Sequence, residues 1–409
     1  MDNTQRQFID ILSDGIRGAS AEKYYENVDW DEVLELANKH KVEGIIYLAL
    51  RKGSLVSKIG NDRLNILKKK AAITGIGQSR HISGLSEVLA KINEREIPVI
   101  VLKGLVVREF YPQPDQRSMS DADILVHKDD VETVKQILID MGYVFLEDHK
   151  ASHHIALVHH KYPVVEVHWH LFKRDGFSNE LEHYERLIWK RAIDINVGKE
   201  SALSLAYDDL ALHLCMHMAA HLAATGFGVR QLCDLVLLVE KKGNEIDWNS
   251  FIMKARMYGF EKFSLIMFLL CKELFNMEVP KGIDIKSVSN KKYVAALIDE
   301  IFESGVHGKK EMANQFATQV AFNFEDKDGN ATLGAIKRYF RFIFPSVDSM
   351  SEKYNYAKKI KILTPIAWIH HLFAGIFFDG YTFKDKYEFL TKGAIVAINR
   401  NKLLEWMEL

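Results

Sequence analysis

Cysteine is scarce in this sequence of 409 residues: there are only three, and no two of them form a CxxC pair. Cys215, Cys233 and Cys271 are too few and too widely spaced to build a disulfide framework. A chain that does not rely on disulfides is typical of a reducing compartment. We therefore expect a cytoplasmic protein held together by a hydrophobic core, since 48% of its residues are hydrophobic.

The sequence also lacks an excess of charge and a long apolar segment. Its formal net charge is −1, which makes nucleic acid a less favoured partner, although a local basic patch is not excluded. The first residues are acidic and amphipathic and show no signal-peptide core. The longest apolar segment, residues 363–378, is shorter than the roughly 20 residues that cross a bilayer. We therefore expect no membrane partner.

Hydrophobic periodicity changes twice along the chain and predicts three regions. Residues 1–95 have helical spacing, residues 96–200 contain β-branched runs between helical segments, and residues 201–409 return to helical spacing. The expected fold class is α+β, with a small mixed β-sheet domain flanked by N-terminal and C-terminal helical regions. In the middle region we predict helices at 103–111 and 129–142, and strands at 97–102, 122–126, 143–147, 154–160 and 164–172.

Two aspartates stand at the start of the second predicted strand, in the stretch SMSDADILV. Side chains two residues apart on a strand point the same way, so Asp121 and Asp123 should project side by side. Ionised carboxylates in that arrangement repel each other unless a cation neutralises them. The pattern predicts a site for a hard divalent cation such as Mg²⁺, with an exposed strand end as the alternative.

Residues on either side of this strand extend the pattern. Lys103 and Gly104 follow the first predicted strand and open a helix, where Gly104 would let a ligand approach the backbone and Lys103 would add positive charge. Two-metal phosphoryl chemistry commonly needs a third carboxylate, which Glu166 would supply, and His168 lies on the same strand face. The alternatives are a surface ion pair for Glu166 and a solvated position for Lys103.

The motifs LKG, YP, R, SDADILV, GY and VEVHWHL, in this order, resemble the poorly characterised nucleotidyltransferase-like proteins of the polymerase-β-type superfamily. The resemblance covers residues 95–240. It implies that Lys103 and Gly104 match the phosphate-binding turn, although the usual residues there are Gly-Ser. It further implies that two acids bind Mg²⁺ and that a third completes the site, which in this sequence are Asp121, Asp123 and Glu166.

The resemblance also implies further nucleotide-binding residues. Some would line a polar face of two helices turned toward the nucleotide cleft, with ordinary helix packing as the alternative. The expected nucleotide-binding group, besides the Lys-Gly turn, is Arg117, His168, His217, His221, Arg230 and Asp234. Seven histidines fall between residues 149 and 170, but their spacing fits no closed zinc site and no cysteine is near, so zinc is not expected.

Taken together, these patterns predict an enzyme. We expect transfer of a nucleoside monophosphate from a nucleoside triphosphate to an acceptor hydroxyl, with two Mg²⁺ ions, or Mn²⁺ in their place, as cofactors. The acceptor would be a small molecule or a protein. One alternative is kinase-like transfer of the γ-phosphate on the same fold. The other is a catalytically lapsed nucleotide-binding or scaffold module, which the altered Lys-Gly turn favours.

Overall fold

The structure is a computed structural model that describes residues 1–22, 27–146, 153–171, 179–306, 344–347, 350, 352–370 and 398–409. The chain forms two compact units, one of Met1–Met218 and Gly228–Asn290 and the other of Ala219–Phe227 and Lys291–Leu409. The division into regions 1–95, 96–200 and 201–409 stays a prediction. Within the described ranges no helix has the length and apolar composition needed to span a bilayer. Residues 371–378 of the apolar segment lie outside those ranges.

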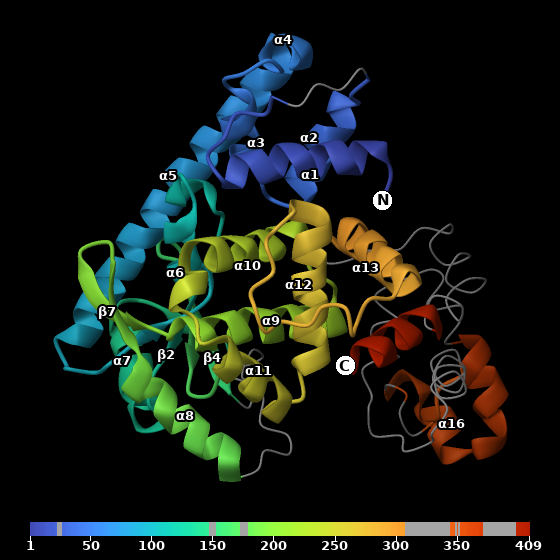
Figure 1. The fold of residues 1–409 in the computed structure, drawn as a ribbon. Coiled ribbons are helices and arrows are strands. Elements are labelled where there is room, and N and C mark those ends of the chain that lie inside the picture. Colours follow the sequence, from blue (N-terminus) through green and yellow to red (C-terminus); the bar gives the residue numbers. More distant parts are fainter. Residues whose placement is uncertain are drawn as a thin grey trace. The chain divides into compact units, whose positions relative to one another are not determined.

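The first unit begins with helices, as predicted. They are α1 (Asn3–Ile16), α2 (Trp30–Lys39), α3 (Glu43–Leu50), α4 (Val56–Ile59) and α5 (Asn61–Asn93) (Figure 1). A capping box starts α1, because Asp2 accepts a hydrogen bond from the Gln5 backbone N–H and the Gln5 side chain accepts one from the Asp2 N–H. The apolar stripe of α1 is buried, and α1 contacts α3. The long helix α5 contacts α3 and extends to the sheet.

A mixed seven-stranded sheet confirms the predicted α+β class. Its strand order is β3-β4-β5-β2-β1-β7-β6, with two parallel pairs, β2 with β5 and β1 with β7, among antiparallel ones. The strands are β1 (Ile100–Val101), β2 (Asp121–Leu125), β3 (Val144–Phe145), β4 (His154–Val158), β5 (Val164–His168), β6 (Ile193–Val197) and β7 (Glu200–Ser204). All five predicted strands are present, although each is shorter than predicted or begins slightly earlier.

The β6–β7 hairpin was not predicted from the sequence. In β6, Ile193, Ile195 and Val197 alternate with polar residues, which is a strand pattern that the sequence prediction missed, whereas β7 (ESALS) contains no β-branched residue. A two-residue loop, Gly198 and Lys199, joins them, and Gly198 has a φ of 62° at the position where a type II′ turn requires glycine. This hairpin completes the sheet, because β7 pairs in parallel with β1 and so fixes the strand that leads to Lys103.

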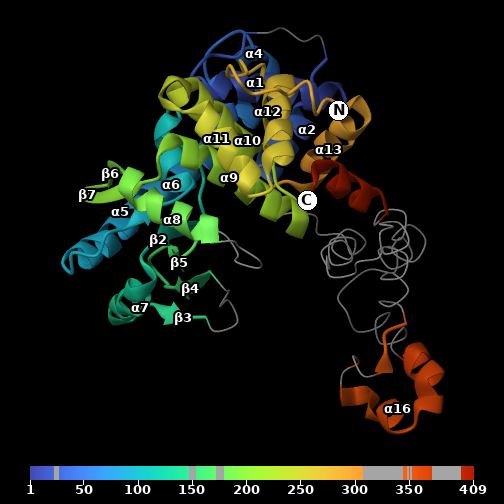
Figure 2. The same ribbon diagram turned by 60° about the horizontal axis from the view of Figure 1, so that its bottom comes forward.

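Helices surround the sheet in the first unit (Figure 2). The predicted helix at 103–111 is a single turn, α6 (Gly104–Val107), followed by a 3-10 turn, and the one at 129–142 is α7 (Val131–Asp140). The remaining helices are α8 (Asn179–Arg191), α9 (Tyr207–Ala224), α10 (Val229–Lys242), α11 (Trp248–Met257) and α12 (Glu261–Phe275). The predicted helical spacing after residue 201 is therefore confirmed in this unit, where α10 packs against α6 and α12.

The second unit is helical wherever it is described. It contains the end of α9, α13 (Lys291–Ser304), the short helix α16 (Asn355–Lys359) and a terminal helix at 398–407. Arg400 of the terminal helix forms an ion pair with Glu300 of α13 and donates a hydrogen bond to the backbone oxygen of Leu222. A small apolar cluster of Met350, Tyr354, Ala357 and Ala367 surrounds α16.

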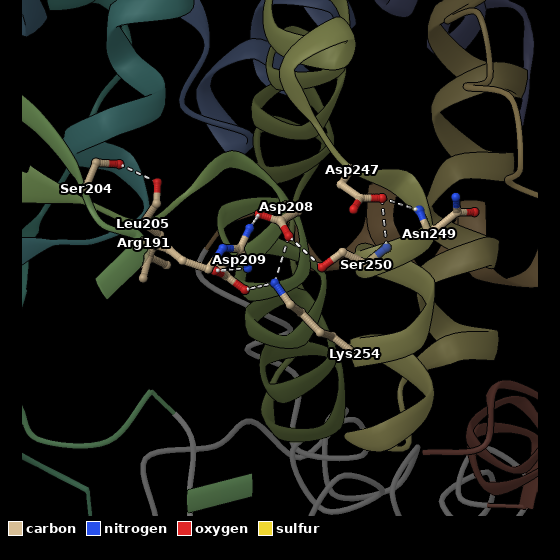
Figure 3. Close-up of polar contacts among 9 residues, drawn as sticks. All are labelled: Arg191, Ser204, Leu205, Asp208, Asp209, Asp247, Asn249, Ser250 and Lys254. Carbon is tan, nitrogen blue, oxygen red and sulfur yellow. Dashed lines mark hydrogen bonds and ion pairs between the residues drawn. The ribbon is translucent and has the colours of Figure 1, made fainter. Parts of the chain in front are cut away.

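A buried ion cluster joins three helices of the first unit (Figure 3). Lys254 of α11 is only 2% exposed and contacts two adjacent carboxylates of α9, those of Asp208, at 2.7 Å, and Asp209. Arg191 at the end of α8 binds the same pair, at 2.5 Å from Asp208 and 3.2 Å from Asp209. Ser250 donates a further hydrogen bond to Asp208. Each buried charge therefore has an opposite charge beside it.

Candidate functional site

The acids predicted as metal ligands stand on adjacent strands. Strands β2 and β5 are parallel, and their register pairs Asp123 with Glu166. Paired residues on neighbouring strands point to the same face, and Asp121, two residues before Asp123, shares that face. The ligand atoms of Asp123, Glu166 and His168 lie within 4.8 Å of one another. The opposite face, with Ala122, Ile124, Val165 and Val167, is fully buried in the core, so hydrophobic packing sets the direction of the acids.

Lys103 neutralises the most buried of these acids. Its Nζ lies 2.9 Å from Asp123 Oδ1, and both side chains are largely buried. Burial alone would lower the pKa of Lys103, but Asp123 and then Asp121 outweigh it and raise the pKa. Lys103 has φ 49° and ψ −117°, a backbone conformation that glycine adopts easily and other residues do not. Such strain persists where the surroundings hold a residue firmly, as they often do at functional sites.

His168 forms the other contact of Asp123. Its Nε2 lies 3.1 Å from Asp123 Oδ1 and 3.5 Å from Glu166 Oε2. Burial alone would lower the pKa of His168, yet hydrogen bonds to these two carboxylates raise it. Burial alone would raise the pKa of Asp123, but Lys103 and His168 hold it well below its usual range. Asp123 is therefore ionised at neutral pH and held by the Lys103 ammonium and the His168 ring N–H.

Asp121 differs from Asp123 in its surroundings. It is half-buried, and Ser120 Oγ donates a hydrogen bond to it at 3.1 Å. Burial, and next the charge of Asp123, raise the pKa of Asp121. A nearby cation stabilises the ionised form of a carboxylate that lies close to other carboxylates, because the cation offsets the repulsion between the negative charges. The pair therefore has the electrostatic signature of a cation site.

Arg117 and Asp234, both predicted nucleotide-binding residues, contact each other. Arg117 donates from Nη2 to Asp234 Oδ2 at 2.6 Å and from Nε to Asp234 Oδ1 at 3.2 Å, and Tyr111 also donates to Asp234. All three are buried. A Cβ atom added at Gly104 would lie 2.3 Å from Arg117 Nη1, so the glycine leaves room for this guanidinium. The cluster joins α10 to the segment after α6, through Tyr111, and to the loop before β2, through Arg117.

The other predicted residues on the helices lie at different places. Arg230 of α10 donates through Nη1 to Ser118 Oγ, at 2.7 Å, and to the Ser118 backbone oxygen, just before β2. His217 of α9 is half-buried, and its ring stacks 6.5 Å from that of His213. His221 belongs to the second compact unit, whereas the acids belong to the first. Arg230 is thus attached to the segment that carries the aspartates.

A cavity of about 290 Å³ lies where β2 and β5 end and α8 passes. Its wall includes Trp169, Trp189 and His127, and the last two rings stack with centroids 3.9 Å apart. His170 Nδ1 and Glu185 Oε2, 2.7 Å apart, provide its polar side. Sequence reasoning did not select these residues. The signal was the aromatic and acidic spacing of α8, which follows directly after the VEVHWHL motif.

The predicted acids offer the donor atoms of the predicted metal, but around these acids the described residues assemble only Asp123, Glu166 and His168 within 4.8 Å, and Asp121 lies outside that group. Asp121, Asp123 and Glu166 offer carboxylate oxygens, which are the ligands that Mg²⁺ and Mn²⁺ prefer. Glu166 keeps 26% of its side chain exposed, so a ligand can reach it. The Lys103 ammonium already neutralises part of the negative charge of Asp123. A metal ion would therefore have to share the Asp123 carboxylate with Lys103 or displace the ammonium.

A pair of substitutions at Lys103 tests the backbone strain. Lys103→Gly and Lys103→Ala both remove the ammonium, but only glycine tolerates φ 49° with ψ −117° at little cost. We expect the glycine variant to be more stable than the alanine variant by about 1 kcal/mol. Denaturant unfolding of both proteins measures the difference. Equal stabilities, or a more stable alanine variant, would contradict the inference that the Lys103 backbone is strained.

Comparisons with known proteins give a matching family model and a similar solved structure. No curated protein matches the chain. Among solved structures, the chain is similar to the antibiotic-resistance factor ANT(2'')-Ia in solution, with 9% sequence identity and a TM-score of 0.33, over 45% of this chain and 96% of that chain. A family model described as uncharacterised nucleotidyltransferase matches residues 26–276, which is more than half of the chain and includes both aspartates and Glu166. The resemblance predicted from the sequence is confirmed, and the chain belongs to this family of uncharacterised nucleotidyltransferases.

Proposed function

We propose that the protein transfers a nucleoside monophosphate from a nucleoside triphosphate to an acceptor hydroxyl in a Mg²⁺-dependent reaction. The observation that carries the proposal is the parallel register of β2 and β5, which sets Glu166 beside Asp123 with Asp121 on the same face. Acids from two separate parts of the sequence then share one small region of the sheet. Membership of a nucleotidyltransferase family supports the same reaction class.

All three acids would bind the metal ion, and one of them would also accept a proton. Mg²⁺, bound by Asp121, Asp123 and Glu166, would neutralise phosphate charge as it develops at the α-phosphate. Glu166, the most accessible of the Asp123–Glu166–His168 group, is the residue proposed to accept the proton of the acceptor hydroxyl. Attack on the α-phosphate from the side opposite pyrophosphate would then release pyrophosphate and leave the monophosphate on the acceptor.

The cationic side chains would serve the triphosphate and the geometry. Lys103, paired with Asp123 in the protein alone, is placed to bind a phosphate oxygen when nucleotide arrives. His168 would hold the Asp123 carboxylate in one orientation through its hydrogen bond. Arg117, Arg230 and Asp234 are proposed to act through the segment that carries Ser118, because Arg117 and Arg230 donate to Ser118 and Asp234 holds Arg117.

We propose that the cavity beside β5 receives a flat part of a substrate, either the nucleobase or a ring of the acceptor. Its Trp189–His127 stack offers an apolar face, and Glu185 and His170 offer hydrogen bonds at its edge. Binding cavities for small molecules commonly combine apolar walls with a few polar groups. The acceptor remains a small molecule or a protein in this proposal.

One observation favours a second candidate, a nucleotide-binding module without catalysis. The Lys103 ammonium rests on Asp123, where an ion would need to bind, and the turn is Lys-Gly instead of the usual Gly-Ser. A residue that fills part of the metal site would allow nucleotide binding while blocking transfer. Calorimetry with ATP and Mg²⁺ separates a binding protein from one that has no nucleotide role.

Labelled ATP distinguishes the reactions. The protein is incubated with cell extract and ATP labelled at the α- or the γ-phosphate, beside an Asp123→Asn control. Nucleotidyl transfer leaves the α-label on an acceptor and depends on added Mg²⁺. If only the γ-label is transferred, the reaction is kinase-like and the proposal is wrong. If neither label is transferred while ATP still binds, the binding module is the better description.

A further inference from the structure

Three histidine rings at the consecutive strands β4 and β5 gather next to the carboxylates. His154 of β4 and His168 of β5 are partners in the antiparallel pairing, with ring centroids 4.9 Å apart. His153, just before β4, places its ring centroid 4.5 Å from that of His154 and 5.8 Å from that of His168. One ring nitrogen of each lies within 4.8 Å of the others. The strands have therefore assembled a compact set of nitrogen ligands.

The separation of the ring nitrogens fits a shared ion. His154 Nδ1 and His153 Nε2 lie 3.1 Å apart. Two imidazole nitrogens that each lie about 2.0–2.1 Å from one tetrahedral Zn²⁺ would be about 3.3 Å from each other. Little movement would bring both to an ion, and the half-buried rings leave it a path from solvent.

His168 has the hydrogen bonding that metal-binding histidines usually show. Its Nε2 is directed at Asp123 and Glu166, so one nitrogen contacts carboxylates. The other nitrogen, Nδ1, is buried and has no hydrogen-bond partner in the part of the chain that the structure describes. Histidines that bind a metal through one nitrogen commonly donate the other N–H to a carboxylate, which fixes the ring. Burying a ring nitrogen without a hydrogen-bond partner costs free energy, and an ion bound at Nδ1 would remove that cost.

We propose that His153, His154 and His168 bind a transition-metal dication, with Zn²⁺ as the ion that suits three imidazole ligands. Three histidines leave a fourth ligand position open, as in catalytic rather than closed structural zinc sites. The carboxylates proposed for Mg²⁺ offer oxygen instead, so the two sites favour different metals. The proposal does not depend on nucleotidyl transfer, because the histidines would bind the ion with or without a nucleotide.

Metal binding is tested on the full chain without nucleotide. The protein is stripped with a chelator, and Zn²⁺ is titrated in competition with a chromophoric chelator. We expect one Zn²⁺ per chain, at least a hundredfold weaker binding for His154→Gln and His153→Gln, and about 10–100-fold weaker binding for Asp123→Asn, which loses the carboxylate partner of His168. His160→Gln is the matched control, since His160 is exposed in the same β4–β5 connection, and should bind as the unchanged protein does.

Co²⁺ provides a second measurement that needs no variant. In a tetrahedral nitrogen site Co²⁺ should give strong visible absorption, which Zn²⁺ then displaces in a ratio of one to one. Circular dichroism of the metal-free variants shows whether they fold. The proposal is overturned if the unchanged protein binds no Zn²⁺, if binding persists in His154→Gln and His153→Gln, or if bound Co²⁺ gives only the weak spectrum of an octahedral ion.

Discussion

Asp123→Asn is expected to lower kcat/KM for nucleotidyl transfer by about a thousandfold or more. Asparagine keeps the shape of the side chain but removes the negative charge that would hold an ion at the α-phosphate. Preorganised charge of this kind is worth several kcal/mol of transition-state stabilisation, and each 1.36 kcal/mol is tenfold in rate. Label retained from α-labelled ATP measures the rate, under conditions where the unchanged protein is active.

The same substitution removes the charge that pairs with Lys103 and changes the hydrogen bond of His168. Lys103 and His168 both contact Asp123 Oδ1, so the variant should also lose some stability, and its unfolding must be measured beside its activity. Asp129→Asn is the matched control, because Asp129 is an exposed acid shortly after the same strand and should leave transfer unchanged. A folded Asp123→Asn protein with full activity would remove the proposed role of the three acids.

The faces of the strands were predictable from the sequence, but the pairing between strands was not. Alternation along DADILV and VVEVH tells which side chains share a face, because a strand has a period of two. Whether Glu166 lies beside Asp123 depends on the parallel register of β2 and β5, and the two strands are separated by the 38 residues 126–163. The same limit applies to His154 and His168, whose proximity follows from the antiparallel register of β4 and β5.

The sequence pointed to the charged residues near the site but not to the partners that they contact. Arg117, Arg230 and Asp234 were named from the family resemblance, and the structure gives each a partner: Asp234 for Arg117 and Ser118 for Arg230. A guanidinium that is buried needs an opposite charge, and only tertiary structure decides which one it meets. The backbone conformation of Lys103 could not be predicted either, because no sequence pattern indicates a positive φ at a non-glycine residue.

Lys254→Ala should lower the free energy of unfolding by about 3–5 kcal/mol, the typical cost of breaking a buried ion pair. Lys254 is the buried cation between Asp208 and Asp209, and the remaining partner, Arg191, is 40% exposed. Without Lys254 two carboxylates would stay close together in a region of low polarity. Lys272→Ala, which removes an exposed lysine from the neighbouring helix α12, is the matched control and should cost little.

The loss should shrink in acid, because the cluster stabilises the fold through an ionised carboxylate. Burial alone would raise the pKa of Asp208, but hydrogen bonds from Arg191 and Lys254 lower it to about 2, against 3.8 for an ordinary aspartate. Its contribution is therefore complete above pH 3.8 and is lost as the pH falls toward 2. In Lys254→Ala the proton would bind more readily, so near pH 4 acid already relieves the variant while Asp208 still stabilises the unchanged protein. Denaturant unfolding at pH 7 and near pH 4 measures how much stability Lys254→Ala loses at each pH. If the loss of stability is larger near pH 4 than at pH 7, the ion cluster does not cause it.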